Sequence, residues 1–89
     1  MKYIDWNDEK NEELKKERGV SFEIVASLIE SQNVLDVINH PNHKKYPNQR
    51  IFIVEIDDYV YLVPFVEEED KIFLKTIIPN RKATNKFIR

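Results

Sequence analysis

The chain has 89 residues and no cysteine, so it suffices for one small domain and offers neither a disulfide framework nor a thiolate metal site. Hydrophobic residues make up 42% of it and charged residues 34%, a balance typical of soluble globular proteins. No apolar run approaches the length that spans a bilayer, and the residues after Lys2 do not form a secretory signal. We therefore expect a single domain over residues 1–89, located in the cytoplasm and without contact to a membrane.

Positive charge is concentrated at the C-terminal end, although the whole chain has a formal net charge of −2. Residues 71–89 hold six basic and no acidic side chains, whereas residues 50–70 hold one basic and seven acidic side chains. A basic block in a slightly acidic chain indicates a local anionic target. A solvated cationic helix is the alternative.

The N-terminal third of the chain predicts two helices. Asn7 is a typical N-cap, and the helix that it begins should end near Arg18, before the single glycine, Gly19. A second helix should follow, capped by Ser21. Its apolar residues recur at the spacing of a core-facing stripe: Phe22, Val25, Ala26 and Ile29.

From residue 33 onward the hydrophobic pattern changes to that of strands. A short strand and a polar loop precede three runs rich in β-branched and aromatic residues: NVLDVI (33–38), RIFIVEI (50–56), YVYLVPFV (59–66) and KIFLKTII (71–78). The connections between the three long runs are too short for a parallel crossover, so these runs should pair as antiparallel neighbours. Pro64 should mark a sheet edge or a bulge because it has no N–H.

In the last run, alternation should place four side chains on one face of the strand: Lys71, Phe73, Lys75 and Ile77. After Pro79, residues 81–89 suffice only for a short terminal helix. The predicted fold is α+β, with two N-terminal helices, an antiparallel sheet of about four strands and a short C-terminal helix. The helical stripe should pack on one face of the sheet, and the other face should be partly open or covered by the terminal helix.

The order of these signals resembles a known family. The segment IDWNDEKNEELKKERGVSF (4–22) opens the chain, an Arg enters the first long strand, and IIPNRKAT (77–84) closes the last one. Over nearly its whole length the chain is similar to the BrnT-like toxins of bacterial toxin–antitoxin pairs, whose fold is similar to that of RelE-type ribonucleases. The resemblance implies a small ribonuclease that acts on RNA.

The same resemblance implies a partner and a set of functional positions. The partner is a cognate antitoxin encoded beside the toxin, usually with a ribbon-helix-helix DNA-binding domain, so that any contact with DNA is indirect. The functional positions of the family fall here on Lys10, Arg50, Arg81 and Thr84, with Lys82 alongside. Many relatives have a His directly before the Gly-Val pair of the second helix, a place that Arg18 takes in this chain.

Metal-free RNA cleavage requires a proton acceptor, a proton donor and cations that stabilise the charge on phosphorus. We expect Arg81 and Arg50 to supply this charge, with Lys10 as a third catalytic residue. An ion pair within the hairpin, to an acid such as Glu55 or Glu67, is the alternative for Arg50.

Phosphate binding is expected from further side chains near the C-terminus and in the polar loop: Lys75, Lys82, Thr84, Lys86, Arg89, Lys44, Lys45 and Tyr46. The loop residues form a basic and aromatic cluster that can hold a single strand by charge and stacking, or merely an exposed loop. His40 and His43, without nearby acids, do not suggest a metal site, and we expect neither metal nor cofactor. Glu17 and Glu55 can act as bases, but no spacing selects them.

Two functions follow from these observations. The first is a metal-independent endoribonuclease toxin that arrests growth and is neutralised by its antitoxin. The second is a non-catalytic module of the same fold, whose basic end binds an acidic partner protein or RNA.

Overall fold

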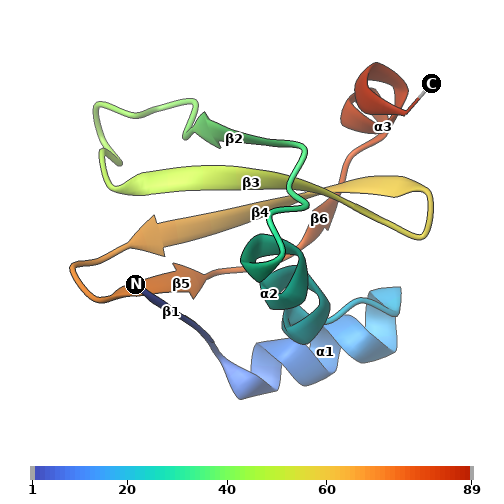
Figure 1. Cartoon of the computed structure of the whole chain (residues 1–89), viewed down its shortest axis with the longest axis horizontal. Helices are drawn as coiled ribbons and strands as arrows, with labels where there is room; N and C mark the ends of the chain where they lie inside the picture. Colours follow the sequence, from blue (N-terminus) through green and yellow to red (C-terminus); the bar gives the residue numbers. More distant parts are fainter. Residues whose placement is uncertain (1, 89) are drawn as a thin grey trace.

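The computed structural model describes residues 2–88, and in this part of the chain six strands form one sheet that packs with three helices (Figure 1). The elements in chain order are β1 (Tyr3–Trp6), α1 (Asp8–Arg18), α2 (Phe22–Glu30), β2 (Asp36–Asn39), β3 (Gln49–Ile56), β4 (Tyr59–Glu67), β5 (Lys71–Leu74), β6 (Ile78–Pro79) and α3 (Arg81–Phe87). The predicted α+β class is confirmed. None of the described helices has the length and apolarity needed to cross a membrane.

The two N-terminal helices begin and end as predicted. The Asn7 side chain accepts a hydrogen bond from the Lys10 N–H at 2.9 Å and caps α1. Gly19 ends that helix with a positive φ of 67°, a conformation that glycine adopts without steric cost, and its N–H bonds to the Lys15 carbonyl. Ser21 caps α2 through its hydroxyl, which accepts from the Ile24 N–H.

A buried asparagine joins these helices. Asn11 is 3% exposed; its side-chain oxygen accepts from the Phe22 N–H at 2.8 Å, and its Nδ2 donates to the Glu23 carboxylate at 2.8 Å. Both functions of the amide are therefore satisfied, as burial of a polar group requires. The bonds fix the first turn of α2 against the middle of α1.

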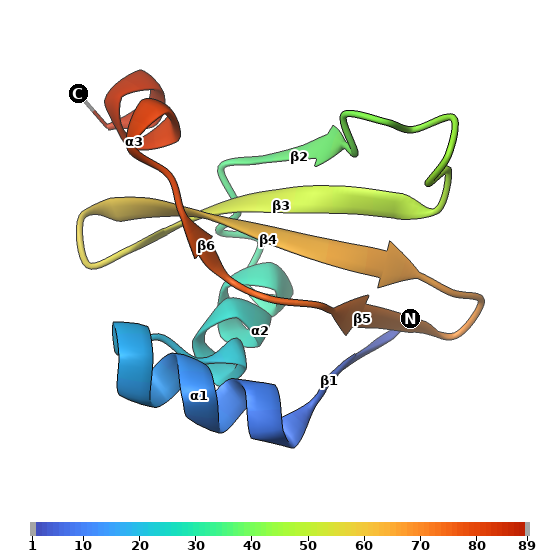
Figure 2. The same cartoon turned by 180° about the vertical axis from the view of Figure 1, so that it is seen from behind.

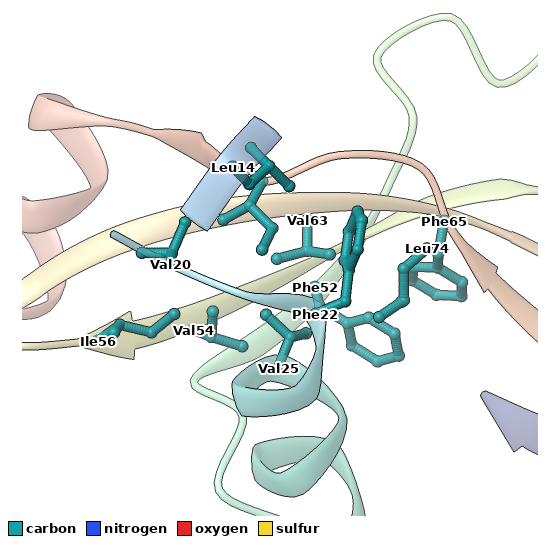
Figure 3. Packing of buried hydrophobic residues seen from close by; sticks show 11 residues of the cluster. Leu14, Val20, Phe22, Val25, Phe52, Val54, Ile56, Val63, Phe65 and Leu74 are labelled. Carbon is teal, nitrogen blue, oxygen red and sulfur yellow. The ribbon is translucent and has the colours of Figure 1, made fainter. Parts of the chain in front are cut away.

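The core lies between the sheet and these two helices (Figure 3). We call this side of the sheet the inner face. Phe22 and Val25 of α2 are fully buried there, as predicted, and Ala26 is nearly so. They meet the inner face of the strands, where the rings of Phe52 and Phe65 stack at a centroid distance of 4.0 Å.

The three long apolar runs pair as the antiparallel meander that the sequence predicts. β4 is antiparallel to both β3 and β5, and the main path of the sheet is β1-β5-β4-β3-β2. The sheet has six strands where about four were expected. β1 was not predicted because it is only four residues long, and its partner β5, to which it runs parallel, lies near the other end of the chain.

The last apolar run is not one strand, and this corrects the predicted face. It divides into β5 and β6, and between them Ile77 turns into the core, where it is fully buried. Ile77 therefore does not share the face of Lys71 and Phe73. The guanidinium of Arg18 donates to the Ile77 carbonyl at 2.8 Å and ties the end of α1 to this break.

Pro64 lies in β4, an inner strand, rather than at the edge or bulge expected for it. It is tolerated because it stands where the neighbour of β4 changes from β5 to β6. There its carbonyl accepts a hydrogen bond from the Lys75 N–H at 2.8 Å. No strand residue in the gap between β5 and β6 needs a backbone N–H from this position, so the missing N–H of proline costs no ladder hydrogen bond.

The side of the sheet away from α1 and α2 is the outer face, and α3 covers one end of it. Figure 2 shows β6 crossing β4 on the way to α3, which lies beside the β3–β4 turn. The expectation of a partly covered second face is thus confirmed.

Candidate nucleic-acid interface

The basic helix α3 is fixed to the sheet through one residue of β4. Asn80 donates its N–H to the Val60 carbonyl at 3.0 Å, and the Val60 N–H donates to the Thr84 hydroxyl at 2.9 Å. The same hydroxyl donates to the Asn80 carbonyl at 2.8 Å, while the Asn80 side chain caps the helix at Ala83. Both backbone groups of Val60 therefore hold the beginning of α3.

This arrangement corrects the role expected for Thr84. The side chain is 2% exposed, and its hydroxyl both donates and accepts within the protein. It is thus not presented to a phosphate in solvent. Thr84 positions α3, and with it the cations that the helix carries.

 Arg81, in the first turn of α3, lies at a pocket of about 410 Å³, which we call the Arg81 pocket. Side chains of α3 and of the start of β4 line the Arg81 pocket: Tyr59, Arg81, Thr84 and Asn85. None of these described lining residues is acidic, so the pocket combines an exposed guanidinium with neutral hydrogen-bonding groups.

Sequence reasoning missed Tyr59 and Asn85. Tyr59 follows the β3–β4 turn, and its ring lies edge-on to that of Tyr61 at a centroid distance of 5.8 Å. Nothing in the spacing of the sequence singles it out, because only the packing of α3 beside the turn brings it to Arg81. Asn85 lies in the next turn of α3, four residues after Arg81, so it shares a helix face with the arginine.

Arg50 has a different environment, at the opposite end of the hairpin. Its guanidinium forms an ion pair with Glu67, which also accepts a hydrogen bond from the Lys2 ammonium at 2.9 Å. The guanidinium lies over the Phe65 ring, 5.4 Å from its centroid. The hairpin ion pair that was the alternative for Arg50 is therefore what the structure contains.

The hydrogen bond from Lys2, and after it the one from Arg50, lowers the pKa of the Glu67 carboxyl below its ordinary value. The pocket of about 550 Å³ beside this group includes three acidic residues of the β4–β5 turn region in its lining: Glu67, Glu68 and Glu69. Lys2 and Arg50 also line it, but both pair with Glu67, and the acids outnumber these two cations. This pocket is therefore a poorer place for RNA than the Arg81 pocket.

The two arginines do not converge on one surface, which corrects the geometry that joint catalysis requires. Arg50 pairs with Phe65 in the β3–β4 ladder, whereas Tyr59 is at the turn. The six steps along β4 from Tyr59 to Phe65 correspond to about 20 Å of strand. In both views α3 lies at the turn end of the hairpin, away from the loop that enters β3 (Figures 1 and 2).

The remaining cations near the C-terminus divide into two groups. Lys82 and Lys86 are exposed on α3, next to Arg81 along the chain. Lys75 is exposed between β5 and β6. Arg89 lies outside the described residues.

Lys10 is half-buried in the first turn of α1, on the side of the sheet opposite to α3.

The polar loop between β2 and β3 does form a basic and aromatic cluster. The His40 and Tyr46 rings lie 4.8 Å apart, and the Lys45 ammonium is 5.5 Å from the Tyr46 centroid. Tyr46 is half-buried, while His43, Lys44 and Lys45 are exposed. The cluster leads into β3, at the Arg50 end of the hairpin, so the structure does not join it to Arg81.

One comparison with known proteins gives a match. The model of the family described as "Ribonuclease toxin, BrnT, of type II toxin-antitoxin system" matches residues 6–86. Neither a curated protein nor a solved structure matches the chain.

Replacing Thr84 with Val should release α3 from β4. The change keeps the shape of the side chain but leaves the buried Val60 N–H without its acceptor, which costs about 1–3 kcal/mol in the free energy of unfolding. We expect amide hydrogen exchange at Val60 to accelerate, because α3 then opens more often. Thr76→Val is the matched control and should leave that exchange rate unchanged. Unaltered exchange at Val60 in Thr84→Val would contradict the anchoring role.

Replacing Glu67 with Gln tests the ion pairs that Glu67 forms with Lys2 and Arg50 at the Arg50 end of the hairpin. The Glu67 pKa is lowered in the folded state, so the carboxylate stabilises the fold above the ordinary carboxyl pKa of about 4.3 and loses this effect as the pH falls through the lowered value. The carboxylate is 32% exposed, so solvent screening limits the cost at pH 7 to about 0.5–1 kcal/mol.

Urea unfolding of wild type and Glu67→Gln, at pH 7 and at acidic pH, measures this difference. The gap between the two proteins should shrink as the medium becomes acidic, because the protonated carboxyl resembles the amide. Glu69→Gln, in the same turn, serves as the control and should show a smaller gap at pH 7. A gap for Glu67→Gln that is independent of pH would contradict the proposed cause.

Proposed function

The chain belongs to the BrnT family of ribonuclease toxins of type II toxin–antitoxin systems, and on this premise we propose that it is a metal-independent endoribonuclease that cleaves RNA at the Arg81 pocket. The observation that carries the proposal is the exposed Arg81 guanidinium at a pocket with Tyr59 and Asn85 and without an acidic lining residue among those described. Family membership supports the ribonuclease class, and the composition of the pocket supports the choice of Arg81.

Cleavage of this kind forms a bond from the RNA 2′-oxygen to the neighbouring phosphorus and breaks the bond from phosphorus to the 5′-oxygen. Negative charge accumulates on the nonbridging oxygens in the transition state, and a planar guanidinium can bind two of them at once. Arg81 has this role in our proposal. The charge it stabilises exists mainly in the transition state, so Arg81 should affect turnover more than binding.

Proton transfer is assigned to Tyr59 and to water. A phenol carries a transferable proton at neutral pH, and tyrosine is among the side chains that act in general acid–base catalysis. Tyr59 would donate to the leaving 5′-oxygen, while the proton of the 2′-hydroxyl passes to water in the open pocket. The Asn85 amide, on the same face of α3, would orient a phosphate or a base by hydrogen bonding.

The exposed lysines extend the cationic surface for the RNA backbone. Lys82 and Lys86 lie on α3, and Lys75 precedes β6. We propose that they attract RNA without taking part in the reaction, since each adds a counterion contact and therefore mainly affects binding and its salt dependence. The acidic turn at Glu67–Asp70, at the far end of the hairpin, directs the strand away from that end.

Three further features belong to the same proposal. The arrangement of two helices on one face of an antiparallel meander supports a RelE-like fold. The antitoxin would carry a ribbon-helix-helix domain, so that the toxin reaches DNA only through its partner. The site of action is the cytoplasm, where RNA and antitoxin are both present.

One observation favours the alternative of a non-catalytic binding module. Of the two arginines expected to stabilise the charge on phosphorus, only Arg81 lies at the pocket, whereas Arg50 pairs with Glu67. A basic helix with a single guanidinium suffices to bind an acidic partner or RNA. Cleavage of RNA by the purified protein separates the two functions.

Arg81→Ala should reduce RNA cleavage in the presence of EDTA by about 100-fold or more, the usual effect of removing one transition-state donor. The binding of RNA under the same conditions should fall by less than about tenfold, because one phosphate contact is lost. Single-turnover cleavage of a labelled RNA and its equilibrium binding measure the two effects. Both proteins must show the same circular dichroism and thermal unfolding.

Arg50→Ala is the matched variant at the other end of the hairpin and should retain most of the cleavage rate. Equal losses in the two variants would remove Arg81 from its catalytic role. Absence of cleavage by the well-folded wild-type protein would contradict the enzyme and leave the binding module. Cleavage that disappears with EDTA would contradict the metal-independent mechanism.

A further inference from the structure

A second hollow adjoins α3 on the outer face of the sheet, and it differs in character from the Arg81 pocket. It has a volume of about 270 Å³ and lies between α3 and the strands β2, β3 and β4. We call it the α3–β2 groove. Most of its lining is apolar, and the complete lining is Asp36, Ile38, Ile53, Leu62, Asn80, Lys82, Ala83, Lys86 and Phe87.

The groove is bordered by large apolar side chains that solvent reaches. Ile38 is 38% exposed, and Ile78, at 40%, pairs with Leu62 in the β6–β4 ladder, so both point to the outer face. β2 pairs only with β3 among the described strands and forms an edge of the sheet. An edge strand with exposed apolar residues is a ready site for association with another chain.

Charge is distributed unequally around the groove. Lys82 and Lys86 belong to its α3 side, and Asp36 is on its β2 side. A complementary occupant therefore has apolar side chains in the middle and acidic residues along the side that faces α3. This is the pattern of an amphipathic segment, in which one stripe is apolar and its flank is charged.

The dimensions and chemistry favour a protein segment over other ligands. A volume of about 270 Å³ is below the range of about 300–1,000 Å³ typical of small-molecule sites. The aliphatic side chains of Ile38, Ile53 and Leu62 give no hydrogen bond to the phosphates of RNA, which would meet cations only at the α3 side of the groove. It does gain free energy by burying the apolar side chains of a partner.

We propose that the α3–β2 groove receives an amphipathic, acidic segment of the antitoxin. The identity of the partner rests on the proposed function and on the toxin–antitoxin family to which the chain belongs. The apolar stripe of the segment packs on Ile38 and Leu62, and its acids pair with Lys82 and Lys86. The groove and the Arg81 pocket lie on opposite faces of α3, because Lys82, Ala83, Lys86 and Phe87 line the groove, whereas Arg81, Thr84 and Asn85 line the pocket. The bound segment therefore withdraws Lys82 and Lys86 from RNA and leaves the Arg81 pocket itself unfilled.

The full-length toxin and the antitoxin encoded beside it provide the test. Ile38→Asp places a charge in the groove, whereas Val37→Asp places the same charge on the other face of the same strand. Both residues are 38% exposed, which makes Val37→Asp a closely matched control. Affinity for the antitoxin is measured by isothermal titration calorimetry. Ile38→Asp should lower it about 30-fold or more, a loss typical of a residue that dominates an interface, and Val37→Asp should lower it by less than about threefold.

Lys86→Glu is a second variant that keeps the test valid if Ile38→Asp does not fold, because Lys86 is exposed on α3. It should also weaken the antitoxin complex, and more strongly at low than at high salt. RNA cleavage is measured separately and without antitoxin. If the wild-type toxin does not cleave RNA, and Ile38→Asp but not Val37→Asp loses affinity for the antitoxin, the proposed function is contradicted and the groove proposal is supported.

Three results would overturn the inference. The first is an equal loss, or no loss, of antitoxin affinity in Ile38→Asp and Val37→Asp. The second is a loss of RNA binding by Ile38→Asp with unchanged antitoxin affinity, which would assign the groove to RNA. The third is a dimer of the toxin that Ile38→Asp converts to a monomer without weakening the antitoxin complex, which would assign the groove to a second copy of the chain.

Discussion

The two backbone hydrogen bonds of Val60 determine where the positive charge of this protein lies. A helix as short as α3 is not stable alone in water, so its position depends on the bonds from Val60 to Asn80 and Thr84. β5 and then β6 pair with the same edge of β4, and α3 follows them along that edge. The chain thus uses one strand edge to anchor three successive elements, and the basic end is held at the β3–β4 turn.

The hairpin of β3 and β4 separates two charged regions of different composition. At one end the Glu67 carboxylate pairs with both Lys2 and Arg50. At the other end, exposed cations of α3 adjoin a pocket and an apolar groove. In the proposed function, the acidic turn repels an approaching RNA strand and α3 attracts it. The same helix borders both the proposed reaction pocket and the proposed antitoxin groove, on opposite faces, so its cations are divided between the two.

Local signals in the sequence sufficed for most of the fold. Asn7, Gly19 and Ser21 marked the helix ends through their own backbone chemistry, and short connections imposed antiparallel pairing on the long runs. Features that depend on distant contacts were not predictable in this way. β1 is a strand because β5 lies beside it, and Ile77 leaves its expected face because the core accepts it. For the site, the charge block pointed to α3, but neither Tyr59 nor the engagement of Arg50 by Glu67 follows from spacing.

The central claim is that RNA binds at the α3 end of the hairpin and not at the Arg50 end. Amide chemical-shift changes on titration with a 2′-deoxy oligonucleotide, which lacks the hydroxyl needed for cleavage, test it most directly. The account predicts that the largest changes occur at Tyr59, Arg81 and Asn85 and that the amides of Lys2 and Glu67 change little. The largest changes around Lys2 and Glu67, with α3 unaffected, would contradict it.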